Sequence, residues 1–119
     1  MPSRLIDVGD STSKTLLLYL TNDVSVDYVA LSYCWGPQAQ KQILTQYNSS
    51  EWRSKGLSIV PLPRTIQDAV TVTRGLGLRY LWVDSLCIIQ DSQEDIEQEI
   101  GKMQYVYENA YVTVVAADA

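Results

Sequence analysis

A glutamate lies beside the apolar face of an amphipathic helix predicted in the second half of the segment Arg79–Ala110. At about 100° per residue, that face consists of Ile96, Ile100, Met103, Tyr107 and Ala110, and Glu99 falls at its margin. A half-buried carboxylate is costly unless it is paired or hydrogen-bonded. Glu99 therefore either has a structural role, in an ion pair or as a side chain that reaches out to solvent, or is kept as an acid of tuned reactivity. Both readings stay open at this point, and Glu99 is the catalytic candidate.

A second group of polar and aromatic residues follows two predicted apolar strands, Tyr28–Trp35 and Arg79–Val83. If these strands are parallel, their carboxyl ends meet at one sheet edge, where open α/β sheets bind ligands. The candidate binding residues at this edge are Ser32, Tyr33, Trp35, Asp84, Ser85 and Gln90. Asp84 has an equal alternative as a cap of the following loop, and Trp35 and Trp82 have an alternative in core packing.

The sequence contains no histidine, which excludes Ser-His-Asp and Cys-His catalysis and all metal sites that depend on imidazole. Cys34 and Cys87 lack the CxxC spacing of a zinc site, and we expect them to be free buried thiols. Asp84, Asp91 and Asp95 do not have the spacing of a calcium loop. We therefore predict no metal site and no resident cofactor.

Composition points to one small α/β domain over residues 1–119, with 46% hydrophobic residues and a net charge of −5. Nine scattered Lys and Arg residues argue against a nucleic-acid partner. No apolar run reaches the roughly 20 residues that span a bilayer, and the N-terminus lacks the apolar segment of a secretory signal. We expect a cytoplasmic protein without a membrane span.

The order of predicted elements favours a small, mostly parallel sheet between two helical layers. Strands are predicted at Thr15–Leu20, Tyr28–Trp35, Arg79–Val83 and Tyr111–Ala116. A long connection over 38–63, with one short helix near Ser49–Lys55, precedes a helix that begins after Pro63 and stops at Gly75 or Gly77. Ser92 or Asp91 is expected to cap the helix that carries Glu99.

Several long stretches resemble the fungal heterokaryon incompatibility (HET) domain family. They are RLIDVG at 4–9, YVALSYCWG at 28–36, LPRTIQDAVTVTRGLGLRYLWVDSLCIIQDSQED at 62–95, and the pattern Glu99, Met103, Tyr107, Asn109, Ala110. The resemblance covers nearly the whole chain, although Ile96 stands where the family often has Trp. Family members usually continue into longer C-terminal regions, so we expect a truncated or partial member.

The resemblance implies a cell-death effector in fungal non-self recognition, acting with regulatory or recognition domains. The family is similar in turn to Toll-receptor-like (TIR) domains, which implies a flavodoxin-like sheet, homo-oligomers, and cleavage of NAD as substrate by a helix-borne glutamate, here Glu99. A carboxylate near the ribose could stabilise an oxocarbenium-like transition state without histidine. The alternatives are a non-enzymatic homotypic interaction module and an inactive truncated relative.

Overall fold

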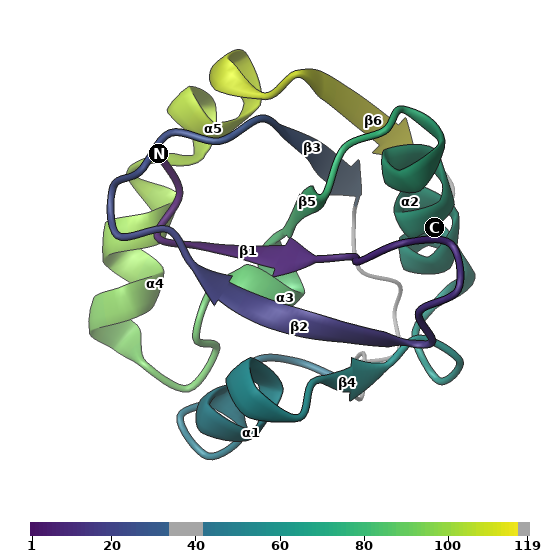
Figure 1. Ribbon diagram of the computed structural model, residues 1–119. Coiled ribbons are helices and arrows are strands. Elements are labelled where there is room, and N and C mark those ends of the chain that lie inside the picture. The colour runs from purple at the N-terminus through teal and green to yellow at the C-terminus, as the bar shows by residue number, and fades with distance from the viewer. Residues whose placement is uncertain (34–41, 117–119) are drawn as a thin grey trace.

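The computed structural model describes residues 1–33 and 42–116, and these contain a single mixed sheet of six strands (Figure 1). The strands are β1 Arg4–Asp7, β2 Thr15–Leu20, β3 Tyr28–Tyr33, β4 Leu57–Ser58, β5 Tyr80–Val83 and β6 Val112–Ala116. Their order across the sheet is β4-β2-β1-β5-β3-β6. β3 is parallel to both β5 and β6, whereas β1, β2 and β4 add an antiparallel half.

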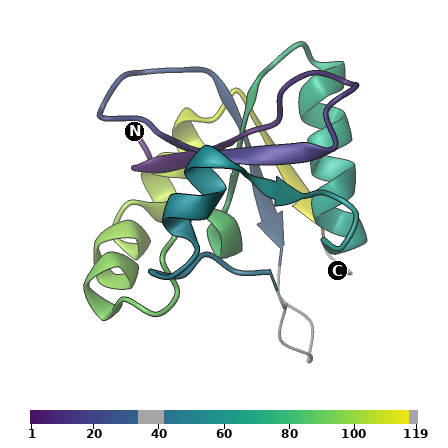
Figure 2. The ribbon, with the colours of Figure 1, turned by 60° about the horizontal axis from the view of Figure 1, so that its bottom comes forward.

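Helices lie on both sides of the parallel strands, which confirms the predicted α/β class. The helices are α1 Ser49–Ser54, α2 Arg64–Gly75, α3 Asp84–Cys87, α4 Gln93–Ile100 and α5 Met103–Asn109. Figure 2 shows α2 on one side of β3, β5 and β6, with α4 and α5 on the other. The short helix α1 packs beside β2 in the antiparallel half.

The prediction for α2 is confirmed in its bounds and in its buried face. Pro63 precedes the first turn, and the buried residues of the helix are Ile66, Ala69, Val70 and Thr73. The chain leaves the helix through Gly77, whose φ of 75° suits a residue without a Cβ. The amide of Leu78 then returns to the carbonyl of Thr73, which closes the end of the helix.

Two strands, β1 and β4, were absent from the prediction, which read residues 1–14 as turn-rich and 38–63 as a connection. β1 has only four residues, and it forms because it pairs with β2 on one side and β5 on the other. β4 has only two residues and pairs with Thr15 and Leu16. Strands this short have too few residues to show the alternation of apolar and polar side chains that predicts a strand. Their stability comes from partner strands that are distant in the sequence.

The predicted single helix through Glu99 and Tyr107 is in fact two helices, α4 and α5. The series of helical hydrogen bonds is interrupted at Gly101 and Lys102, where the Lys102 amide donates to the carbonyl of Glu99, three residues back. The expectation that Ile100 faces the core is wrong, since Ile100 is 54% exposed. The other residues of the predicted face are partly buried against the core, namely Ile96, Met103, Tyr107 and Ala110. Val106 and Glu99 are buried as well.

Candidate functional site

Glu99 ends up almost fully buried, with 3% of its surface exposed, and its carboxylate has partners at both oxygens. Oε1 accepts the backbone N–H of Ser3 at 3.3 Å, and Oε2 accepts the Ser3 hydroxyl at 3.1 Å. The Lys102 ammonium lies 3.2 Å from Oε2 and also donates to the Ser3 hydroxyl at 3.0 Å. Glu99 thus ties the end of α4 to the segment that leads into β1.

A second ion pair fixes the same two segments. The guanidinium of Arg4 donates to both carboxylate oxygens of Asp95, at 2.8 and 3.0 Å, and to the carbonyl of Cys87 at 3.1 Å. Asp95 also accepts the backbone N–H of Ile89 at 2.8 Å. Its own amide donates to the hydroxyl of Ser92, which confirms the predicted helix cap. These bonds hold α4 against β1 and α3.

Tyr107 of α5 interacts with residues at the carboxyl ends of two parallel strands, Ser32 on β3 and Asp84 directly after β5. Ser32 is hydrogen-bonded to the Tyr107 hydroxyl; burial raises the pKa of that hydroxyl, the Ser32 bond lowers it, and the charge of Asp84 raises it. The net pKa of Tyr107 is raised. The Tyr107 ring meets that of Trp82 edge to face, with centroids 5.5 Å apart. Trp82 is 1% exposed and belongs to the core, the alternative foreseen for it.

Ser85 and Gln90, the other candidates near this edge, help to fix the turn through α3. The side-chain amide of Gln90 donates to the carbonyls of Asp84 and Ile88, at 3.0 and 2.9 Å. Ser85 is fully buried, and its carbonyl accepts the amide of Leu44. Both residues therefore help to fix the backbone around α3, which begins at Asp84.

Two further candidates cannot be placed in the same way. Trp35 lies outside the described residues, as does Cys34. Tyr33 is the last residue of β3, paired in register with Ala116, and its side chain lies outside the described part.

Ser32 and Asp84 thus both act on Tyr107, whereas Glu99 has a different set of contacts. Within residues 1–33 and 42–116, the hydrogen-bond and ion-pair partners of the Glu99 carboxylate are Ser3 and Lys102, and neither was a candidate. The thiol of Cys87 is fully buried, and burial raises its pKa. Sequence reasoning missed Ser3 because it precedes an unpredicted strand. Tyr107 was noticed, but only as a core residue.

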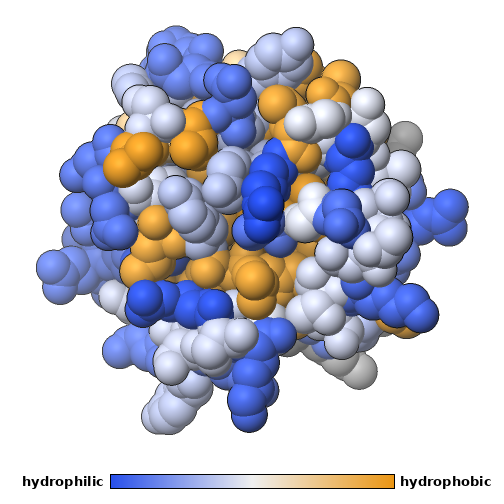
Figure 3. Space-filling view, in the orientation of Figure 1, coloured by the Kyte–Doolittle hydropathy of each residue, from blue (hydrophilic) through white to orange (hydrophobic). Residues whose placement is uncertain are grey.

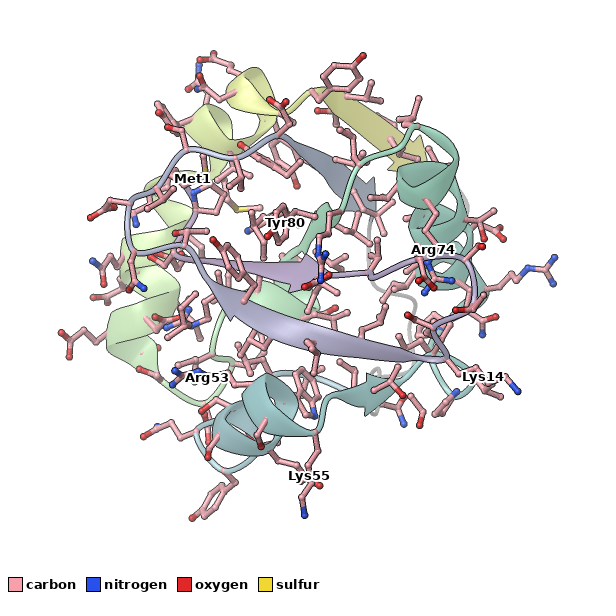
Figure 4. All side chains as sticks on the ribbon, in the orientation of Figure 1. Met1, Lys14, Arg53, Lys55, Arg74 and Tyr80 are labelled. Atoms are coloured by element: carbon pink, nitrogen blue, oxygen red, sulfur yellow. The ribbon has the colours of Figure 1, made fainter. Side chains whose placement is uncertain are left out.

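Two of the hollows in the described surface adjoin β2. A groove of about 570 Å³ runs between β2 and α1, and a smaller hollow of about 200 Å³ includes Ser3 and Arg4 in its lining. Figure 3 shows apolar side chains gathered over β1 and β2 on the face seen in Figure 1. The rings of Tyr19 on β2 and Tyr80 on β5 are stacked, with centroids 4.6 Å apart, and Figure 4 shows Tyr80 over the middle of the sheet.

Neither a metal centre nor a membrane span is found in the described part of the chain. No three potential ligands among its Cys, Asp and Glu side chains come close enough to hold an ion. None of its helices has both the length and the apolar character needed to cross a bilayer.

Comparison with known proteins gives a consistent result. The model of the family described as "Heterokaryon incompatibility protein (HET)" matches residues 28–119. "Heterokaryon incompatibility protein 6, OR allele" of Neurospora crassa is 28% identical over 125 residues, which cover 94% of this chain and 18% of that protein. The chain thus spans less than a fifth of the length of this relative, and no solved structure matches it. With most of its length matched by the family model, this chain belongs to the heterokaryon incompatibility (HET) family.

Proposed function

We propose that this chain is the signalling module of a fungal heterokaryon incompatibility protein, and that it promotes cell death by binding other proteins and not by hydrolysing NAD. Membership of the HET family and the Neurospora relative support the incompatibility role. The observation that carries the choice between binding and catalysis is the state of Glu99, which is 3% exposed and fully partnered.

Glycosidic cleavage of NAD needs a carboxylate that contacts the ribose as positive charge develops there. Here Ser3 and Lys102 occupy the oxygens of Glu99, and substrate could reach them only after both partners moved. The nearest described hollow, which includes Ser3 in its lining, has a volume of about 200 Å³. Ligand pockets usually measure roughly 300–1,000 Å³. These features favour a structural role for Glu99.

Cleavage of NAD is the second candidate function, and the cluster at the carboxyl ends of β3 and β5 favours it. Ser32 and Asp84 lie at or directly after the ends of parallel strands, at the sheet edge where α/β folds bind ligands, and both act on Tyr107. In that mechanism Glu99 is the catalytic carboxylate, and Ser32, Tyr33, Trp35, Asp84, Ser85 and Gln90 bind the substrate. The third alternative, an inactive truncated relative, predicts that the chain lacks a cooperative unfolding transition.

The test compares NAD hydrolysis by the parent, by Glu99→Gln and by Glu97→Gln, which alters an exposed carboxylate of the same helix. Each protein is first shown to be folded by circular dichroism and to unfold cooperatively, and is then incubated with NAD while nicotinamide is followed by chromatography. We expect no release by any of them. Release by the parent and by Glu97→Gln, but not by folded Glu99→Gln, would establish catalysis at Glu99 and overturn the proposal.

A further inference from the structure

The outer edge of β2 is only half covered, because β4 ends after two residues. Thr21 donates to the carbonyl of Ser3 in the register that pairs β1 with β2, so the odd residues of β2 bond β1. The amide of Ile59 donates to Lys14 on the other side, so the even residues face β4. Leu16 meets Leu57 there, whereas the backbone groups of Leu18 and Leu20 point outward beyond the end of β4.

β4 does not extend further along β2, because the residues before Leu57 belong to α1 and to the short connection through Gly56. Gly56, with φ of 86°, passes so close to β2 that a Cβ would lie 2.3 Å from the carbonyl oxygen of Leu16. Upstream of Gly56, α1 packs beside β2, and the groove of about 570 Å³ lies along the surface where the two elements meet. The groove is lined by Leu18, Tyr19, Leu20, Asn22, Ser50, Arg53 and Ser54.

One wall of the groove is positively charged. Figure 4 shows Arg53 beneath the carboxyl end of β2, whereas Lys55 points away from the sheet. The ion pairs found among the described residues do not include Arg53, so its guanidinium is open to a carboxylate from outside. Ser50 and Ser54, one turn apart on the same wall, add hydroxyl groups. The lining thus combines a free strand edge with a cation and small polar side chains.

We infer that this groove binds an extended segment of a partner protein that carries an acidic side chain. The segment pairs with Leu18 and Leu20 as an added strand in line with β4, and its carboxylate meets Arg53. Strand addition supplies affinity through backbone hydrogen bonds, and the ion pair selects acidic over basic segments. This inference rests on the proposed role as a protein-binding module, and it names the surface that does the binding.

The test uses two blocked peptides, TVTETVT and TVTKTVT, and amide hydrogen exchange of the whole chain measured by NMR. We expect the acidic peptide, at ten times its Kd, to slow exchange at Leu18 and Leu20 about tenfold. Exchange at Tyr19, whose amide bonds β1, is expected to stay unchanged. A TVTETVT peptide N-methylated at three consecutive central amides should not bind, because neither of its edges can pair. Equal binding of that peptide, or no slowing at millimolar TVTETVT, overturns the inference.

Matched charge reversals test the acidic preference. Arg53→Glu is expected to weaken TVTETVT binding about fivefold, and Lys55→Glu, on the side of α1 that faces away, less than about twofold. Equal effects of the two variants, or a parent that prefers TVTKTVT, contradict the assigned chemistry. If amide exchange at Leu18 slows when the protein concentration alone is raised, a second copy of this chain fills the groove. That result would also overturn the inference of a partner protein. Failure of the peptides to bind would not change the result of the NAD assay, so the two experiments test the two proposals independently.

Discussion

The ion pair between Arg4 and Asp95 allows the anchoring of β1 to be measured. The two side chains are 14% and 12% exposed, and Asp95 accepts three bonds, two from Arg4 and one from the amide of Ile89. Charge-assisted bonds contribute roughly 1.5–3 kcal/mol each, so their plain sum exceeds about 4 kcal/mol. Water can reach part of the vacated site, and we therefore expect Asp95→Ala to lower the free energy of unfolding by about 3 kcal/mol.

The assay is urea unfolding followed by tryptophan fluorescence, and the matched control is Asp68→Ala. Asp68 pairs with Arg64 on α2, where the side chains are 65% and 86% exposed, so its loss should cost less than about 0.5 kcal/mol. In a double-mutant cycle, Arg4→Met and Asp95→Ala should show a coupling energy of about 2 kcal/mol. The reasoning is refuted if Asp95→Ala and Asp68→Ala destabilise the chain equally, or if the coupling energy is near zero.

Tyr28→Phe removes a buried hydroxyl that donates to a carbonyl of α5 at 2.6 Å, and should cost about 1–2 kcal/mol in a denaturant titration. Burial raises the pKa of Cys87 from 9.0 to about 12, so the stability linked to its neutral thiol is complete below pH 9 and lost as pH rises toward 12. Unfolding free energies between pH 9 and 11 should fall less steeply for Cys87→Ala, and an identical slope contradicts this. Gly56→Ala should destabilise the chain by about 2 kcal/mol or more, because φ at this position is positive and the Cβ of an alanine would collide with β2. Gly75→Ala, with open space in α2, should instead stabilise it by about 0.5–1 kcal/mol, and thermal unfolding of both variants checks the contrast.

The sequence was sufficient for elements whose stability is encoded locally or in a long pattern. The face of α2 was predicted residue by residue, because twelve residues give three turns of apolar periodicity between Pro63 and a terminal glycine. The apolar runs of β3 and β5 were equally clear. In contrast, β1 and β4 are short, and each depends on partners that are distant in the chain, so local patterns could not reveal them.

The burial of Glu99 could be predicted from the sequence, whereas its contacts could not. Periodicity placed Glu99 at the margin of a buried face, and the structure buries it, but the choice between a reactive acid and a tethered one depended on Ser3. No spacing rule relates residues 96 positions apart. The apolar periodicity continues across Gly101, so the break between α4 and α5 could not be derived from it, since tertiary packing decides where the helix ends.

The position of β1 has a consequence for how the polypeptide is made and divided. The family match starts at residue 28, yet β1 occupies an inner position of the sheet, between β2 and β5. Cutting the gene at the start of the match would remove β1 and β2 together and leave a flank of β5 without its neighbour. During synthesis, Ser3 and Arg4 can contact their partners only after α4 has left the ribosome. The nascent chain therefore completes this sheet late, and until then its unpaired apolar strands can associate with other chains.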